Sequence, residues 1–129
     1  MYILVVDDHP LFAEALRQVL LRLGNHTIVH IAENADKAFQ LIEQHKLYDL
    51  ILVDVNLPGL DGFGLIRKLS KNFNTTPIII ISADHNIKIA QQVNKQGVMG
   101  YIHKSLQAKE IISIVRLVLG GCLFPIRDR

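Results

Sequence analysis

The sequence predicts an α/β fold in which a doubly wound, five-stranded parallel sheet carries helices on both faces. Short apolar runs alternate five times with segments whose apolar residues recur at helical spacing, and the connections between them are mostly short. A strand, a helix and a second strand in that order form a right-handed crossover, which makes the strands parallel. The chain has 129 residues, 50% of them hydrophobic, which is enough for one domain with a substantial core.

Five strands are expected, and each is an apolar run bounded by turn residues. The third and fourth runs lack the alternation that marks a half-exposed strand, and residues 78–81 are all isoleucine. Continuous β-branched residues favour a strand that is buried on both faces at the centre of a sheet. The expected strands cover residues 2–6, 27–32, 49–54, 77–82 and 98–103.

Each strand is followed by an expected helix, and cap residues mark the helix ends. Asn34 and Asp61 precede two of the helices, and their side chains can accept hydrogen bonds from the free amides of a helix N-terminus. Gly24, Gly97 and Gly120 follow the other three, because glycine readily ends a helix. The expected helices cover residues 11–23, 34–46, 62–73, 86–96 and 106–119.

The composition excludes several classes of function. The formal net charge is +2, and the 14 Lys and Arg residues are spread along the chain, so no basic stripe favours nucleic-acid binding. The single cysteine, Cys122, excludes an internal disulfide framework. No apolar run reaches the roughly 18 residues of a transmembrane helix, and the N-terminus lacks the basic region of a signal peptide. We therefore expect a cytoplasmic domain without a membrane partner.

Polar residues lie at the ends of four of the five expected strands. Asp7 and Asp8 follow the first strand, Asp54 ends the third, Ser82 ends the fourth and Lys104 follows the fifth. The carboxyl ends of parallel strands share one edge of the sheet, where open α/β sheets bind their ligands. A strand order of 2-1-3-4-5 would bring the first two carboxylates beside the third.

The residue types at this edge suit one kind of chemistry. Three neighbouring carboxylates repel one another unless a cation joins them, and a cluster of oxygen ligands with room for water suits Mg²⁺. Lys104 adds a positive charge that favours a phosphoryl oxygen or the Asp54 carboxylate. Ser82 offers a hydroxyl donor. A carboxylate flanked by Mg²⁺ and a lysine can accept a phosphoryl group and form an aspartyl phosphate.

The sequence to about Gly121 resembles the receiver domain of bacterial two-component response regulators. The resemblance rests on an ordered set of residues and one loop, namely Asp7, Asp8, Asp54, Ser82, Tyr101 and Lys104, with the loop Leu57-Pro58-Gly59-Leu60-Asp61-Gly62. It implies a flavodoxin-like fold with five helices and the strand order 2-1-3-4-5. It also implies that a histidine kinase or phosphotransfer protein transfers a phosphoryl group to Asp54.

The resemblance implies a metal site made of oxygen ligands. Asp7 and Asp8 would bind Mg²⁺, together with Asp54 and the main-chain carbonyl of Asn56. Such a domain is a regulator rather than an enzyme, although it assists its own phosphorylation and dephosphorylation.

The resemblance also implies a switch. Ser82 would bond a phosphoryl oxygen, Lys104 would neutralise it, and Tyr101 would turn inward as the serine moves. The surface formed by the fourth helix, the fifth strand and the last helix would change, and it is the expected partner or homodimer face.

Two features resemble receivers that are joined to a LuxR-type helix-turn-helix output domain. These are the run Asp7-Asp8-His9-Pro10-Leu11-Phe12, and Ser105 after Lys104, where many receivers carry proline. We therefore expect a receiver domain over residues 1–121 and a tail or truncated linker over 122–129. Transcription is the expected output, and DNA would be bound only through an output domain that this chain lacks. The cis or trans state of the peptide bond before Ser105 stays open.

Other interpretations stay open from the sequence alone. A phosphohydrolase with an aspartyl nucleophile would carry Asp-x-Asp-x-Thr after the first strand, whereas this strand is followed by Asp-Asp-His. A receiver-like interaction module that is not phosphorylated would not need the acidic cluster. The six histidines show no metal-ligand spacing, and His9, His85 and His103 are expected to be loop or surface residues. Tyr101 alone is compatible with a half-buried aromatic.

Overall fold

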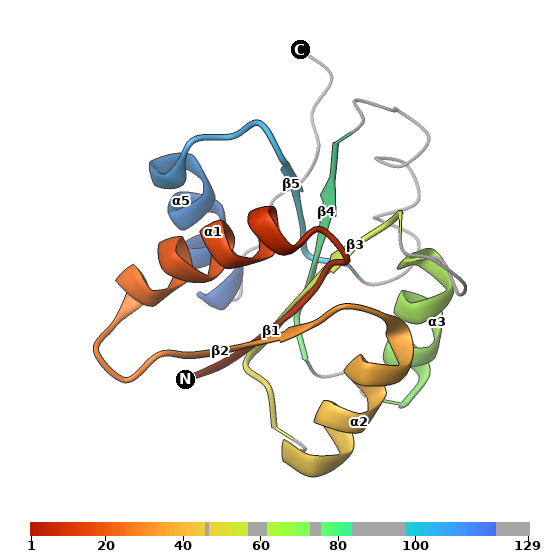
Figure 1. The fold of residues 1–129 in the computed structure, drawn as a ribbon. Coiled ribbons are helices and arrows are strands. Elements are labelled where there is room, and N and C mark those ends of the chain that lie inside the picture. Colours follow the sequence, from red (N-terminus) through yellow and green to blue (C-terminus); the bar gives the residue numbers. More distant parts are fainter. Residues whose placement is uncertain (46, 57–61, 73–75, 84–97, 121–129) are drawn as a thin grey trace.

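The computed structural model describes residues 1–45, 47–56, 62–72, 76–83 and 98–120 and confirms the predicted fold. Five parallel strands lie in the order β2-β1-β3-β4-β5 (Figure 1). The strands are β1 (Tyr2–Val6), β2 (Ile28–Ala32), β3 (Leu50–Asp54), β4 (Ile78–Ser82) and β5 (Gly100–His103). The helices are α1 (Pro10–Leu20), the 3₁₀ turn η1 (Leu21–Leu23), α2 (Ala35–His45), α3 (Gly62–Asn72) and α5 (Ala108–Leu119).

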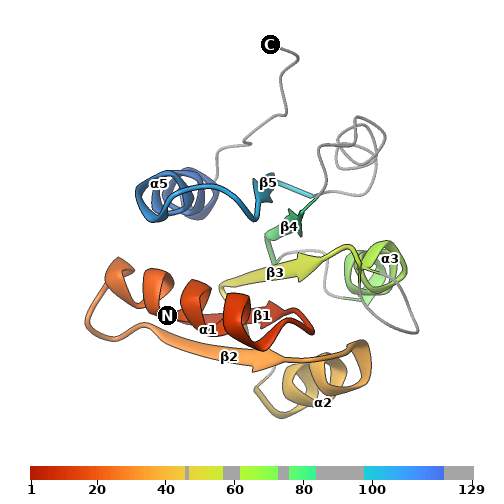
Figure 2. The ribbon, with the colours of Figure 1, turned by 45° about the horizontal axis from the view of Figure 1, so that its top comes forward.

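The described helices cover the sheet in two layers. Figure 2 shows α1 and α5 on one face and α2 and α3 on the other. Successive strand residues point to opposite faces, so each strand contributes to two separate cores. Leu4, Val53 and Ile80 pack in the core beneath α2 and α3, whereas Leu52 and Ile79 pack in the core beneath α1 and α5.

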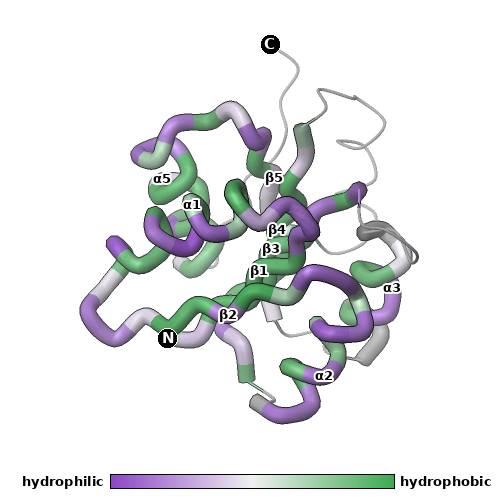
Figure 3. The backbone as a smooth tube through the Cα atoms, in the orientation of Figure 1, coloured by the Kyte–Doolittle hydropathy of each residue, from purple (hydrophilic) through white to green (hydrophobic). Residues whose placement is uncertain are grey.

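The central strands are apolar because water reaches neither of their faces. Every residue of β3 and of β4 is buried, and the tube in Figure 3 is hydrophobic through the middle of the sheet. This burial explains the continuous apolar runs that the sequence shows in place of alternation. Asp54, the last residue of β3, therefore lies at the end of a fully buried strand.

The register brings the strand ends to one level. Val6 of β1 lies opposite Val53 of β3, and Asp54 lies opposite Ile81 of β4. Ser82, the next residue of β4, lies opposite His103 of β5. The residues that follow β1, β3, β4 and β5 therefore share one edge of the sheet.

Local contacts set the helix ends. The Asn34 side chain accepts a hydrogen bond from the Lys37 N–H at 2.8 Å, which confirms the predicted cap. Helix α1 starts one residue earlier than expected, because Pro10 suits the first turn, where its missing N–H is not needed. Helix α5 starts two residues later than expected, since the Gln107 N–H donates to Glu110 Oε1 at 3.2 Å and caps the helix there.

Strand β5 also starts two residues later than expected, at a position that suits glycine. A Cβ atom on Gly100 would lie 3.2 Å from Val118 Cγ2 of α5. The absence of a side chain lets α5 pack closely against the end of the sheet.

Several expectations lie outside the described residues. These are the helix over 86–96, the caps Asp61 and Gly97, the loop over 57–61, His85, and the tail over 122–129 with Cys122. In the described part of the chain, no helix is both long and apolar enough to cross a membrane.

Candidate functional site

Two buried carboxylates lie at neighbouring strand ends. Asp7 follows β1 and Asp54 ends β3, and each residue is only 1% exposed. The Asp7 N–H donates to the Ala32 carbonyl at 2.9 Å, which continues the pairing of β1 with β2 by one residue. Because β1 and β3 are adjacent and in register, the fold brings the two side chains together although 47 positions separate them in the sequence.

Lys104 is the cation that reaches both of these carboxylates. Its Nζ lies 3.0 Å from Asp7 Oδ2 and 3.0 Å from Asp54 Oδ2, and its side chain is 14% exposed. The Lys104 N–H donates to the Ser82 carbonyl at 2.8 Å, so the end of β4 positions the lysine backbone. Nζ also lies 4.8 Å from the centroid of the Phe12 ring, a cation–π contact that the sequence did not indicate.

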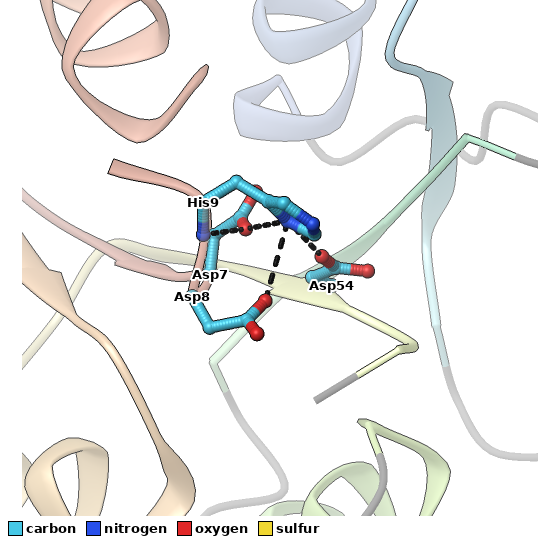
Figure 4. A group of neighbouring side chains, drawn as sticks. All are labelled: Asp7, Asp8, His9 and Asp54. Atoms are coloured by element: carbon cyan, nitrogen blue, oxygen red, sulfur yellow. Dashed lines mark hydrogen bonds and ion pairs between the residues drawn. The ribbon is translucent and has the colours of Figure 1, made fainter. Parts of the chain in front are cut away.

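His9 lies among the carboxylates, whereas the sequence analysis expected a loop or surface residue there and gave it no role in the site. Its Nδ1 is 2.8 Å from Asp7 Oδ1, 3.2 Å from Asp8 Oδ1 and 3.4 Å from Asp54 Oδ2 (Figure 4). The hydrogen bond with Asp7 raises the pKa of His9, while the charge of Lys104 opposes that rise. The side chain is 57% exposed, as expected of a loop residue. The sequence signal for this position is that His9 directly follows Asp7 and Asp8.

The charges in this cluster do not balance. The cluster contains three carboxyl groups, from Asp7, Asp8 and Asp54, but only two basic groups, those of Lys104 and His9. Among the described residues, Asp7 Oδ2 is a buried side-chain oxygen that accepts no hydrogen bond, since its contact with Lys104 lacks hydrogen-bond geometry. A buried carboxylate oxygen that accepts no hydrogen bond is free to bind a further cation.

The donor set fits a divalent metal ion. One ligand atom from each of Asp7, Asp8, His9 and Asp54 lies within 4.8 Å of all the others. The Asp8 side chain is 34% exposed, which leaves room for water on the ion. Carboxylate oxygens beside solvent are what Mg²⁺ takes in proteins. The Asn56 N–H donates to Asp54 Oδ1 at 2.9 Å; its carbonyl as a metal ligand stays a prediction.

Ser82 and Tyr101 belong to β4 and β5, which continue the sheet beyond β3. Ser82 is fully buried at the end of β4, the strand beside Asp54. Tyr101 is partly buried and packs against the core beneath α2 and α3, so it is a half-buried aromatic here. Their roles toward a phosphoryl group stay predictions.

His103 connects the loops that follow β4 and β5. Its Nε2 donates to the Ala83 carbonyl at 2.9 Å, and its Nδ1 accepts from the Ser105 N–H at 3.0 Å. The expectation of a loop or surface residue is not met, because His103 is the partly buried last residue of β5.

Comparison with known proteins identifies the family. The response regulator receiver domain matches residues 3–116. The chain belongs to this receiver domain family. Its curated relatives include the glycerol metabolism activator of Pseudomonas putida, 34% identical over 122 residues, which cover 95% of this chain and 55% of that protein. A probable NarL transcriptional regulator of Mycobacterium tuberculosis is 33% identical over 113 residues, covering 88% of this chain and 52% of that protein.

Solved structures agree with this assignment. A LuxR-family response regulator from Aurantimonas matches with a TM-score of 0.86 and 26% identity, over 95% of this chain and 86% of that one. The receiver domain of the putative NarL of M. tuberculosis matches with a TM-score of 0.81 and 31% identity, over 93% and 96%. The chain spans about half the length of the curated relatives it matches. It is therefore a receiver domain of the two-component response regulators, with LuxR- and NarL-type relatives.

Membership in this family has general consequences. Receiver domains are regulators, they generally bind Mg²⁺ at their acidic residues, and they typically interact with histidine kinases. Which residues of this chain carry those functions is a separate question.

Proposed function

We propose that this receiver domain accepts a phosphoryl group on Asp54 from a histidine kinase or a phosphotransfer protein. The observation that carries the proposal is the position of this carboxylate, which is buried at the end of β3 with the Lys104 ammonium 3.0 Å away. Asp49, which precedes the same strand, is exposed and has no lysine among its described ion-pair partners. The two aspartates therefore differ as nucleophiles.

The cluster around Asp54 would hold the metal ion that phosphoryl transfer needs. Asp7, Asp8, Asp54 and the Asn56 carbonyl would be its ligands, as the resemblance implies, and this is supported by Asp7 Oδ2, which is buried without a hydrogen bond among the described residues. When bound, Mg²⁺ would supply positive charge to offset the repulsion between the carboxylates and an incoming phosphoryl group.

The chain's own groups would then position and neutralise the reactants. The Asn56 N–H fixes Asp54 through Oδ1, and Lys104 contacts Oδ2. In the reaction, a bond forms between an Asp54 oxygen and phosphorus, and the bond from phosphorus to the donor's leaving group breaks. Lys104 would move from the carboxylate to a phosphoryl oxygen, so its charge stays paired throughout.

The response would spread along β4 and β5. Ser82 would bond a phosphoryl oxygen, and Tyr101 would turn inward, which shifts an existing equilibrium between two conformations. The surface of α5, β5 and the segment expected to form a helix over 86–96 would change and bind a partner or a second copy. The domain would also assist its own phosphorylation and dephosphorylation.

The cellular location of the domain and its link to an output domain are also proposals. Residues 1–121 would form a cytoplasmic receiver, and 122–129 would lead toward a helix-turn-helix output domain that binds DNA and controls transcription. The support is the length of the curated relatives, of which this chain spans about half.

Mass spectrometry of the intact chain tests the acceptor. With a small phosphodonor and Mg²⁺, the wild type should gain one phosphoryl group and Asp54→Asn should gain none. Asp49→Asn is the matched control, since it changes an exposed aspartate at the other end of β3, and it should gain one group. Full labelling of Asp54→Asn at the wild-type rate would overturn the proposal.

The same experiment separates the alternative functions. A stable single phosphorylation supports a receiver that signals. Release of phosphate over many turnovers would indicate a phosphohydrolase, and a folded wild type that gains no mass would indicate an interaction module that is not phosphorylated.

A further inference from the structure

The imidazole of His103 bridges the chain segments that follow β4 and β5. Its Nε2 donates to the Ala83 carbonyl at 2.9 Å, although the two residues are 20 positions apart in the sequence. Its Nδ1 accepts from the Ser105 N–H at 3.0 Å and is also contacted by the Ser105 hydroxyl. One side chain of β5 is therefore bonded to the residue that directly follows Ser82.

The two main-chain partners fix the orientation of this ring. The Ala83 carbonyl can only accept a hydrogen bond, so Nε2 carries a proton. The Ser105 N–H can only donate, so Nδ1 presents its lone pair. Both partners select the same neutral tautomer, and rotation of the ring would break both hydrogen bonds.

Lys104 lies inside the turn to which this ring is bonded. The Leu106 N–H donates to the His103 carbonyl at 3.0 Å, which makes Lys104 and Ser105 the two central residues of a four-residue turn. From this turn the lysine side chain reaches the acceptor, with Nζ 3.0 Å from Asp54 Oδ2. The His103 ring therefore joins the lysine turn to the chain after β4.

The lysine needs such support because its side chain is long and flexible. Its Nζ lies 3.0 Å from both Asp7 Oδ2 and Asp54 Oδ2, so the carboxylates alone do not select one position for the charge. The position of the lysine main chain limits where Nζ can reach when a phosphoryl group arrives. A displacement of about 1 Å at a reacting group can slow a reaction about 100-fold.

We propose that His103 is a positioning residue for phosphoryl transfer and acts through Lys104. The hydrogen bond from Nε2 to the Ala83 carbonyl anchors the turn to the chain after Ser82, and this keeps the ammonium group directed at the acceptor. The inference rests on the proposed function, since Asp54 is the acceptor in that proposal. It gives a role to a histidine for which neither the sequence pattern nor the resemblance to receivers indicates one.

A double-mutant cycle tests whether the histidine acts through the lysine. Intact-mass spectrometry with a small phosphodonor and Mg²⁺ gives the labelling rates of the wild type, His103→Ala, Lys104→Ala and the double variant. The change at His103 should slow labelling roughly tenfold when Lys104 is present and less than about twofold when it is already alanine. His26→Ala, which changes an exposed histidine in the loop before β2, is the matched control and should keep the wild-type rate. Equal slowing in both backgrounds overturns the inference, because a merely structural role is additive.

Two amide variants identify the hydrogen bond that matters. The Gln side chain of His103→Gln places an N–H donor near the position of Nε2, whereas the Asn of His103→Asn replaces only the acceptor at Nδ1. His103→Gln should be labelled within about threefold of the wild-type rate, and His103→Asn should be as slow as His103→Ala. Equal rates in the two amide variants overturn the inference. If His103→Ala does not fold, this pair decides the question, with urea denaturation to show that both variants are folded.

Failure here is distinguishable from failure of the proposed function. If Asp54 gains a phosphoryl group in the wild type while the rate does not depend on His103, only the positioning role is excluded. If the wild type gains no phosphoryl group on Asp54, the proposed function itself fails.

Discussion

The two ends of β3 carry the same residue type in opposite surroundings. Asp49, just before the strand, is exposed, and its Oδ2 accepts a hydrogen bond from the Tyr2 N–H at 2.8 Å. Asp54, at the other end, is buried among Asp7, Asp8 and Lys104. One carboxylate joins two strands through a main-chain donor, whereas the other lies in a group of like charges.

The amino edge around Asp49 contains a hydrogen bond and ring contacts between aromatic side chains. His30 Nδ1 lies 2.7 Å from the Tyr48 hydroxyl, and the rings of Tyr2 and His30 are 6.0 Å apart. The carboxyl edge depends on a lysine and lacks charge balance. The fold holds the like charges of the site close together despite their repulsion. The buried central strands supply the stability that this requires. Mutations at the two edges should therefore have different consequences.

Removal of the lysine should produce the largest effect. Lys104→Ala leaves Asp7 and Asp54 buried without their counter-charge, which should lower the free energy of unfolding by about 3 kcal/mol in chelator. Urea denaturation measures this, with Lys109→Ala of α5, an exposed lysine, as the control that should change little. Divalent cation should restore part of the loss. A loss below about 1 kcal/mol would show that the carboxyl edge does not depend on this charge.

The amino edge should respond to alkaline pH rather than to cations. Burial raises the pKa of Tyr48 to about 12, above its ordinary value of 10. A raised pKa contributes stability that is complete below pH 10 and is lost as the pH rises through 12, on the order of 2 kcal/mol. Wild type should therefore lose more stability than Tyr48→Phe between pH 10 and 12, in denaturation measured at each pH. Parallel losses in both proteins would show that this hydroxyl is not protected by the fold.

The sequence predicts the strand ends well because the signals there are local. Apolar runs that stop at Asp7 and Asp54 mark where buried strands meet the edge, and parallel strands bring such ends together whatever the rest of the chain does. The strand order came from the resemblance to receivers, not from the apolar pattern. Most described element ends were predicted to within one or two residues, but the first helix ends at Leu20 and continues to Leu23 only as a 3₁₀ turn. The start of α5 differed because Gln107 and Glu110 form a cap.

The contacts of His9 and Phe12 could not be predicted from the sequence. Each depends on the direction of a side chain relative to Lys104, which is 92 or more positions away and comes from a different loop. Spacing rules find ligands on one helix or strand, and here the partners come from three separate strand ends. Tertiary structure alone brings them together.

Thermal melting with and without Mg²⁺ tests whether Asp7, Asp8 and Asp54 form one cation site whose charges strain the metal-free fold. The wild type is compared with Asp8→Ala, and with Asp49→Ala at the other end of β3 as control. In chelator, Asp8→Ala should melt roughly 4 °C higher than wild type, because about 1 kcal/mol of repulsion is removed. Asp49→Ala should not melt higher, since it loses only a hydrogen bond.

Mg²⁺ at about tenfold above its dissociation constant should stabilise the wild type and the Asp49→Ala control by about 1.4 kcal/mol, or roughly 5 °C. Asp8→Ala should lose most of that gain. A wild type that shows no Mg²⁺ shift would contradict the account. So would an Asp8→Ala variant that melts lower than wild type in chelator yet keeps the full shift, because the three carboxylates would then not act as one site.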